Sequence, residues 1–444
     1  MLILQHKSKK HSFSNNGDMI LTKIEFKGFR CFSDYCLDFR RGVNLLIGDN
    51  GSGKTSVIRG VVLALNAFFK GFSDENTSSA GITLDDFNHT VANESKSLTR
   101  PAEILFSTEG HSERVSIIRE TKKANTSYKN AREFIWQNKE LYNRVAEEDG
   151  NNRSTPLPLL AFFATDDIHS KEGKVKGKAF KDYYLPPSFG YYFCLKGGFL
   201  AKHWINRMLV LKEGGKGEKE LEVVMNALKK ALGEDGCGII RDVDIRPKQG
   251  YVYFIFTDGR EVRFEDLSDG YLRLVNTVMD LAFRCSVMNR PLYGIDACEL
   301  TEGVVCIDEI DDHLHPSLQA KVIKALRQTF PRVQFIISTH APMIMTSVED
   351  NENNVVYRLD YQEGNYLAEA VSTYGLDASS IIQFYLHQAD KDIDVQRQLD
   401  ELFKLVDEEK IEEAKAMLSI LEDRFSDRLP EITRARTLMS FYEV

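Results

Sequence analysis

The chain has 444 residues, of which 43% are hydrophobic and 28% are charged, and its formal net charge at pH 7 is −9. This composition is typical of a globular protein with enough apolar material for one large domain and a smaller appendage. It excludes a membrane span, because no apolar run approaches the ~20 residues that a spanning helix needs. We find no signal peptide and no Cys-x-x-Cys pair, so we expect a cytoplasmic protein without a zinc site.

The acidic balance means that any contact with DNA or RNA must come from a local basic patch. One candidate is a glycine-spaced lysine run, which consists of Lys171, Lys174, Lys176, Lys178 and Lys181. Such runs are more often solvated loops than binding sites, and we favour that interpretation here. At the N-terminus, Lys7, Lys9 and Lys10 are followed by polar residues, and we expect residues 1–18 to form a flexible tail.

The first elements along the chain are predicted from apolar periodicity. Alternation predicts a strand over 21–29, and a second short strand follows at 36–39. The run at 43–47 is uniformly apolar, which is typical of a strand that is buried on both faces. A glycine-rich turn and a helix over 53–69 come next. Residues 72–100 are rich in Ser, Thr, Asp and Asn, so we expect loops with one short helix there.

The rest of the chain indicates an α/β fold. We expect strands at 115–118 and 157–163, a helix over 218–232, and a hairpin formed by 251–256 and 262–264. From Gly303 onward a buried strand, a helix and a second buried strand alternate, at 304–307, 318–330 and 333–338. Beyond residue 370 apolar residues recur at helical spacing, among them Leu399, Leu402, Phe403, Ile411, Met417 and Leu418. These stripes pack against one another or serve a partner.

A P-loop is the strongest chemical signal in the chain. The segment from Gly48 to Thr55 fits its pattern in full, between a buried strand and a helix. In such a loop backbone N–H groups and the helix N-terminus surround phosphate oxygens. We expect Lys54 to reach the β- and γ-phosphates of ATP and Thr55 to bind Mg²⁺ through its hydroxyl. The predicted nucleotide-binding residues of this segment are Gly48, Asn50, Gly51, Gly53, Lys54, Thr55 and Ser56.

Polar residues follow two of the later strands. Asp308 and Glu309 come directly after the apolar run at 304–307. We expect Asp308 to hold Mg²⁺ through water and Glu309 to act as general base toward the attacking water. His340 follows the strand at 333–338, where an imidazole can hydrogen-bond the γ-phosphate. We expect the strand at 304–307 to place Asp308 beside the P-loop.

A Leu-Ser-Asp-Gly segment at 267–270 opens a predicted helix over 271–288. Ser268 is placed as its N-cap and Gly270 has no side chain, so this terminus suits a phosphate. The order of P-loop, Leu-Ser-Asp-Gly, Asp-Glu and Ser-Thr-His resembles that of ABC-type ATPases. Within that superfamily the chain most resembles compact ATPases of antiphage defence, namely the Septu-type and retron-associated ATPases and the ATPase half of overcoming-lysogenization-defect nucleases. The resemblance covers about 20–347, and the tail from 372 shares features of the Septu and retron group.

This resemblance implies a P-loop sheet flanked by helices with an N-terminal antiparallel β subdomain. It implies a head at 19–360 with an α/β insert at about 105–250, and a helical partner or oligomerisation region at 361–444. Ser268 and Gly270 would bind the ATP of a second copy, so head-to-head dimerisation would complete each site. Arg30 resembles the arginine near the nucleotide in RecF, SMC and Rad50 heads. No glutamine occupies the Q-loop position, where the alternatives are Asp85, Asp86 and Asn88.

The same resemblance implies a function. We find no Toprim, HNH or PD-(D/E)xK nuclease pattern, so we expect this chain to control a separate nuclease subunit, of HNH type, in phage defence. The alternative is a RecF/SMC-like ATPase of DNA repair or maintenance that clamps DNA. The long coiled coil and Cys-x-x-Cys hook of Rad50 are missing from the sequence. A transporter ATPase is disfavoured by the His-Leu-His-Pro segment at 313–316.

Overall fold

The structure is a computed structural model, and it describes the following parts of the chain: 19–72, 77, 79–92, 95–99, 101–111, 114–148, 153–165, 179–198, 200–215, 217–386, 393–425 and 429–440. The expected tail at 1–18 and the lysines at 171–178 lie outside these ranges. The chain divides into two compact units, Met1–Leu376 and Asp377–Val444. No helix among the described residues combines the length and the apolar character needed to cross a membrane.

Unit 1 begins with a four-stranded antiparallel sheet in the order β2-β1-β6-β7. Its strands are β1 (Leu21–Phe29), β2 (Phe32–Asp38), β6 (Ala102–Thr108) and β7 (Val115–Arg119). Buried and more exposed residues alternate along β6, as a sheet covered on one face requires. Phe106 on that buried face contacts Phe134 of α2 (Arg132–Glu147), which packs against this sheet. This sheet is the N-terminal antiparallel subdomain expected from the sequence.

A six-stranded sheet forms the centre of unit 1, in the order β15-β14-β3-β13-β12-β8. All neighbouring pairs are parallel except β14 and β15. Three strands are buried at every residue, as their apolar runs predict: β3 (Val43–Ile47), β12 (Gly303–Ile307) and β13 (Val333–Ser338). The remaining strands are β8 (Leu159–Phe163), β14 (Val355–Gln362) and β15 (Asn365–Val371).

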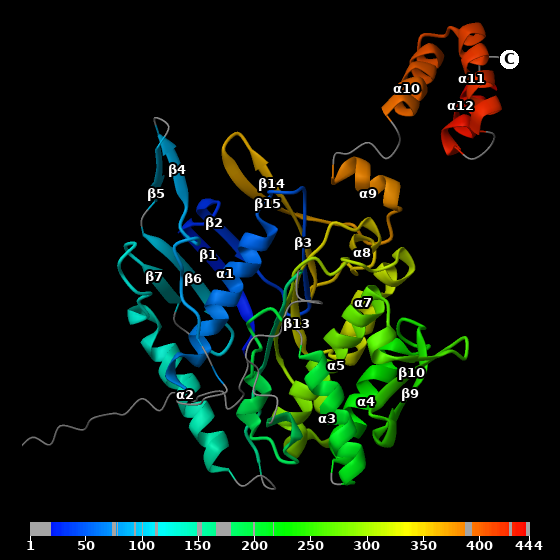
Figure 1. Cartoon of the computed structure of the whole chain (residues 1–444). Helices are drawn as coiled ribbons and strands as arrows, with labels where there is room; N and C mark the ends of the chain where they lie inside the picture. Colours follow the sequence, from blue (N-terminus) through cyan, green and yellow to red (C-terminus); the bar gives the residue numbers. More distant parts are fainter. Residues whose placement is uncertain are drawn as a thin grey trace, which may run out of the picture. The chain divides into compact units, whose positions relative to one another are not determined.

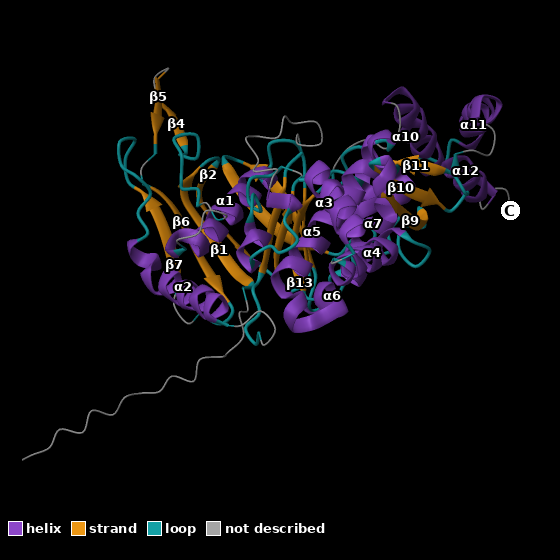
Figure 2. Ribbon diagram, turned by 60° about the horizontal axis from the view of Figure 1, so that its bottom comes forward, coloured by secondary structure: helices purple, strands orange, loops and turns teal. Residues whose placement is uncertain are grey.

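Helices cover both faces of this sheet (Figures 1 and 2). α1 (Lys54–Asn66) contacts β12 and β13 on one side and β6 on the other, so it lies between the two sheets. Gly60 makes this packing possible, because a Cβ there would lie 2.1 Å from the ring of Phe26. The opposite face carries α3 (Ala201–Gly214), α4 (Glu218–Leu232), α5 (Asp269–Tyr293) and α7 (Pro316–Thr329). Two short helices, α6 (Ala297–Leu300) and α8 (Pro342–Met345), complete the unit.

Two expectations about the middle of the chain need revision. None of the described residues between 73 and 100 is helical; instead β4 (His89–Ala92) and β5 (Ser95–Leu98) form a hairpin. The region expected as an insert at about 105–250 contains β7 and β8, which belong to the two main sheets. A separate three-stranded sheet begins near the end of this region and extends beyond it: β9 (Ile240–Arg246), β10 (Tyr251–Phe256) and β11 (Glu261–Arg263), of which the last two form the predicted hairpin.

Unit 2 consists of α9 (Ala378–Phe384), α10 (Ile393–Asp407), α11 (Ile411–Phe425) and α12 (Pro430–Ser440). The last three pack around a core of their own that includes Leu399, Leu402 and Leu418. Phe403, Ile411 and Met417 are partly buried against that core, so much of the apolar stripe packs within the unit. The expected boundary at residue 360 falls inside β14, and the compact units divide at Leu376 instead.

We predict that Leu402→Ala destabilises unit 2 by about 2–5 kcal/mol, because the side chain is fully buried and its removal leaves a cavity. Amide hydrogen exchange of α10, α11 and α12 should become faster, while ATP binding by unit 1 stays unchanged. Ile420→Ala is the control, since Ile420 lies on α11 but is 66% exposed. Unchanged exchange in Leu402→Ala would contradict an independent core in unit 2.

Candidate nucleotide site

The P-loop follows β3 directly and leads into α1, which begins at Lys54. Gly48, Gly51 and Gly53 have φ angles of 135°, 85° and 101°, which are values that glycine adopts at little cost. Gly48 is also constrained by packing, because a Cβ there would lie 2.1 Å from the carbonyl oxygen of Leu359 on β14. Around Gly51 no atom lies within 4 Å of an added Cβ, so the tip of the loop is open. The loop therefore presents its backbone at the N-terminus of a helix, as phosphate binding requires.

Lys54 supplies a positive charge inside the loop. Its Nζ donates hydrogen bonds to the carbonyl oxygens of Gly48 at 2.7 Å and Asp49 at 2.9 Å. The residue is only 6% exposed, and this burial lowers its pKa to about 8 although neighbouring carboxylates oppose the shift. A buried ammonium group without an ion pair is costly, and a phosphate in the loop would compensate that charge.

β12 and β13 end beside the loop and place Asp308 against Thr55. The Asp308 Oδ1 and Thr55 Oγ1 atoms are 3.5 Å apart. Ser338, the last residue of β13, donates a hydrogen bond to Asp308 Oδ1 at 2.5 Å and accepts one from the backbone N–H of Glu309 at 2.8 Å. This serine therefore fixes the two acidic residues relative to each other. The sequence predicts that a strand ends at Ser338, but it does not predict the role of this serine.

Glu309 and His340 face each other at the edge of the site. The Glu309 Oε1 and His340 Nε2 atoms are 4.0 Å apart, and both side chains are about one-third exposed. Burial raises the pKa of Glu309, and the nearby charges of Asp308 and Asp311 add to that effect. Burial lowers the pKa of His340, and Lys54 lowers it further. A carboxylate with a raised pKa next to a neutral imidazole is a suitable pair for proton transfer near neutral pH.

The segment after Glu309 is tied to the strand that carries His340. Asp311 Oδ1 accepts hydrogen bonds from the Thr339 hydroxyl at 2.6 Å and from the His340 backbone N–H at 3.2 Å. Glu309 itself has a φ of 49°, which is unusual for a residue with a side chain. Such strain persists only where surrounding contacts hold it, and the hydrogen bonds of Ser338 and Asp311 provide those contacts.

Ser268 occupies the N-cap position of α5, as predicted, but its side chain makes no capping hydrogen bond. The residue is exposed, so its hydroxyl can reach a ligand outside the chain. Gly270 is buried, and a Cβ there would lie 2.4 Å from the carbonyl oxygen of His313. The Leu-Ser-Asp-Gly segment thus packs against the loop that follows Glu309.

Arg273 connects α5 to the acidic residues and was not predicted from the sequence. Its Nη2 donates hydrogen bonds to the backbone carbonyls of Asp308 at 2.8 Å and Glu309 at 3.0 Å. Its Nη1 lies 3.4 Å from Asp312 Oδ2, and the side chain is 4% exposed. No sequence pattern identifies a buried arginine of this kind, because its partners lie more than thirty residues away.

The residues around Arg30 form a compact turn. Arg30 has a φ of 51°, and its backbone N–H donates to the carbonyl of Asp86 at 2.8 Å. The neighbouring Cys31 thiol is hydrogen-bonded to Ser56 of α1, which brings the turn against the end of the P-loop. Asn88 donates to the Arg30 carbonyl at 2.8 Å.

Two of the three Q-loop alternatives have structural partners. The Asp86 carboxylate forms an ion pair with Arg59 at 3.1 Å and accepts hydrogen bonds from Thr83, and Asn88 holds the turn at Arg30. Burial alone would raise the pKa of Asp86, but the hydrogen bonds from Arg59 and Thr83 lower it overall. Asp85 is exposed and remains the alternative with an unburied side chain.

The donor set also suits Mg²⁺. Thr55 and Asp308 offer one hydroxyl and one carboxylate oxygen beside the phosphate loop. Mg²⁺ usually binds in proteins through one or two carboxylates, waters and substrate phosphates, so these two residues are sufficient. Within the described ranges no group of three or more His, Cys, Asp or Glu side chains could hold a metal ion.

The fold and this arrangement of residues define a P-loop ATPase. The family described as "AAA domain, putative AbiEii toxin, Type IV TA system" matches residues 43–346, and the chain belongs to it. The match begins at β3 and ends after His340, so it includes every predicted site residue except Arg30.

Individual relatives support the resemblance to Septu and retron ATPases. The "Retron Vc95 probable ATPase" of Vibrio cholerae is 35% identical over 29% of this chain, and the match spans 24% of that protein. The "Septu protein PtuA" of Bacillus thuringiensis is 24% identical over 75% of both chains. Among solved structures, an Smc head bound to the C-winged helix domain of ScpA shares 16% identity, with a TM-score of 0.47, over 80% of this chain and 98% of that one.

The pKa of Lys54 leads to a prediction about pH. Because that pKa is about 8, the amino group loses its proton as the pH rises from 7 to 9.5, and the neutral form attracts phosphate less. We expect the affinity for ATP to fall by up to about tenfold per pH unit above 8. Equilibrium titrations at pH 7, 8 and 9 measure this effect. Lys54→Arg is the control and should show a flat profile, since arginine keeps its charge in this range.

Proposed function

We propose that this chain is an ABC-type ATPase of an antiphage defence complex of the Septu or retron kind, and that it controls a separate nuclease. The observation that carries the ATPase part is the convergence of Lys54, Asp308, Glu309 and His340 at the ends of three adjacent parallel strands. The defence part is supported by relatives named as Septu and retron ATPases.

In the proposed reaction each residue has a distinct role. Lys54 and the P-loop backbone bind the β- and γ-phosphates, and Thr55 and Asp308 hold Mg²⁺, which would neutralise phosphate charge when bound. Glu309 accepts a proton from the attacking water, and its raised pKa makes that transfer more favourable. His340 donates a hydrogen bond to the γ-phosphate. Ser338 and Arg273 are positioning residues, since they contact Asp308 and Glu309 and not the reacting atoms.

We infer that two copies pair head to head to complete each site. The exposed hydroxyl of Ser268 at the start of α5 combines with the partial positive charge of the helix N-terminus, which suits a γ-phosphate. Arg273 ties the first turns of the same helix to Asp308 and Glu309. When Ser268 of one copy binds a phosphate, a movement of α5 would therefore be transmitted through Arg273 to Asp308 and Glu309 of the same copy.

The proposed partner is an HNH nuclease held by this ATPase, because ATP-dependent pairing needs a target that responds to it. The alternative is DNA repair or maintenance by clamping DNA. It is supported by a 30% identical match to the Rad50 ATPase of Thermoplasma volcanium, which covers 22% of this chain and 9% of that protein.

Co-expression with the adjacent gene distinguishes these functions. We expect the two products to co-purify and to protect cells from phage, and Lys54→Ala to abolish protection while the complex still forms. If the chain purifies alone and phage sensitivity does not depend on Lys54, the DNA-maintenance function is favoured instead.

Glu309→Gln should retain ATP binding and lose hydrolysis by at least about 100-fold, because an amide cannot accept the proton from water. Steady-state phosphate release measures the rate, and equilibrium titration measures binding. Asp258→Asn is a matched control, since Asp258 is an exposed carboxylate in the turn between β10 and β11, where it pairs with Arg260. Normal turnover by Glu309→Gln would exclude Glu309 as the general base.

Ser268→Arg should leave ATP binding by single heads intact and prevent ATP-dependent pairing, since the new side chain would occupy the position of the partner's γ-phosphate. Light scattering with and without ATP measures pairing. Gly270→Asp is a less specific variant, because its side chain would collide with the carbonyl of His313 within the same chain. Normal ATP-dependent pairing of Ser268→Arg would contradict a shared site.

A further inference from the structure

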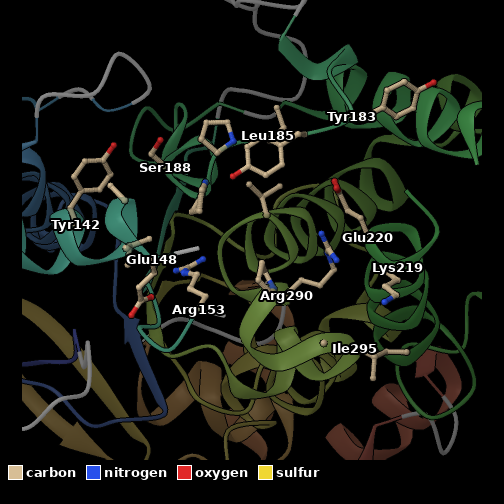
Figure 3. A pocket seen from close by; sticks show the side chains of 18 of the residues that line it. Tyr142, Glu148, Arg153, Tyr183, Leu185, Ser188, Lys219, Glu220, Arg290 and Ile295 are labelled. Atoms are coloured by element: carbon tan, nitrogen blue, oxygen red, sulfur yellow. The ribbon is translucent and has the colours of Figure 1, made fainter. Parts of the chain in front are cut away.

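A cavity of about 840 Å³ lies in unit 1 away from the P-loop (Figure 3). Five parts of the chain line it: the end of α2 with Glu148, Arg153, the loop at 183–188, the start of α4, and the end of α5 with the residues that follow. Its volume is typical of pockets for small molecules, which range from about 300 to 1,000 Å³. The proposed ATPase chemistry uses none of these residues.

Two arginines on the floor of the cavity form no ion pair with any residue that the structure describes. Arg153 is 6% exposed, and two of its nitrogens donate to the carbonyls of Met288 and Thr155. Its Nε and the Nε of Arg290 are buried without a hydrogen-bond partner among the described residues. In Figure 3 the guanidinium group of Arg153 lies on the side of Glu148, and that of Arg290 lies on the side of Glu220. A buried guanidinium without a carboxylate is costly, so this floor favours an anion.

Within the described part of the chain, the carboxylates of the cavity form no direct ion pair with these arginines, although the charge of Glu148 acts on Arg153. Glu148 accepts four hydrogen bonds from the hydroxyls and backbone N–H groups of Ser154 and Thr155. Glu220 forms a bidentate ion pair with Arg207, at 2.5 and 2.9 Å. The hydrogen bonds to Glu148 come from neutral groups and lower its pKa to about 2, so this carboxylate keeps its charge. Among the described lining residues, Glu148 and Glu222 therefore oppose Arg153, Arg290 and the exposed Lys219, which leaves one positive charge in excess. The cavity therefore has an excess of positive charge.

Much of the remaining lining is aromatic and apolar. It includes Tyr142, Tyr183 and Tyr184, together with Leu185, Pro186 and Pro187. Tyr183 and Tyr184 are 49% and 73% exposed, so their rings are accessible to a flat ligand. Tyrosine rings bind planar groups by stacking, and guanidinium groups bind phosphate through paired hydrogen bonds.

We propose that this cavity binds a nucleotide, that is, a phosphate group on Arg153 and Arg290 and a base against the tyrosines, at a site separate from the P-loop. The separation follows from α5, which has 25 residues and is therefore about 37 Å long. Its first turns reach the acidic residues through Arg273, whereas its last turn carries Arg290 into the cavity. The two sites lie toward opposite ends of one helix.

The test is calorimetric titration of the full-length Lys54→Ala protein with AMP, GMP and UMP, so that the P-loop contributes little to binding. We expect at least one of these nucleotides to bind, and Arg290→Gln in the same background to weaken that binding by about tenfold or more, since it removes a charge-assisted contact. Arg144→Gln is the matched control: Arg144 is an exposed arginine of α2 outside the cavity, and its replacement should change nothing.

Three results would overturn the inference. One is the failure of all three nucleotides to bind, and another is unchanged binding by Arg290→Gln. The third is equal affinity for inorganic phosphate and for the nucleotides, which would show that the tyrosines contribute nothing. ATP binding by Arg290→Gln with Lys54 intact reports on folding, and it keeps the failure of this site distinct from a failure of the ATPase function.

Discussion

The parallel pairing of β3, β13 and β12 is the constraint on which the nucleotide site depends. Because all three strands run in the same direction, their carboxyl ends meet at one edge, and each end carries a different part of the chemistry. β3 leads to the P-loop, β12 to Asp308 and Glu309, and β13 to Ser338 and His340. The strands are buried at every residue, so a shift in their pairing would expose apolar side chains and separate the P-loop from its acids.

Electrostatics then determines what this edge can do. A half-buried glutamate with a raised pKa lies near a lysine whose pKa is lowered to about 8, and a neutral histidine completes the group. In each of these groups the pKa shift disfavours the charged form, and shifted pKa values of this kind are typical of reactive sites. Ser338, Asp311 and Arg273 provide the hydrogen bonds that hold the acids in place. Arg273 also makes α5 part of the site, because it connects the helix that begins after Ser268 to Asp308 and Glu309 within one copy.

The sequence predicts this edge well because its signals are local. The P-loop pattern and the uniformly apolar strands before Gly48 and Asp308 are recognisable without knowledge of distant contacts. β14 and β15 were missed because their half-exposed pattern is weaker than that of the buried strands. The hairpin of β4 and β5 was mistaken for loop and helix, since polar strands resemble turns in composition.

Contacts between distant segments could not be predicted. In the sequence, Arg273 is one of several polar residues in a predicted helix. Only the fold shows that it contacts the carbonyls of Asp308 and Glu309. In the same way, only the fold shows that the His313 carbonyl leaves no room for a side chain at Gly270. The second cavity is assembled from five parts of the chain, and no single one of them carries a motif.

In the proposed dimer each ATP site combines the P-loop of one copy with Ser268 of another, and mixing two variants distinguishes such a shared site from independent heads. Lys54→Ala and Ser268→Arg proteins should each be inactive alone. Their mixture should regain ATP hydrolysis, because a mixed pair contains one site with an intact P-loop and an intact Ser268. If Ser268→Arg alone hydrolyses ATP at the wild-type rate, each head acts by itself and the ATP site is not shared between copies.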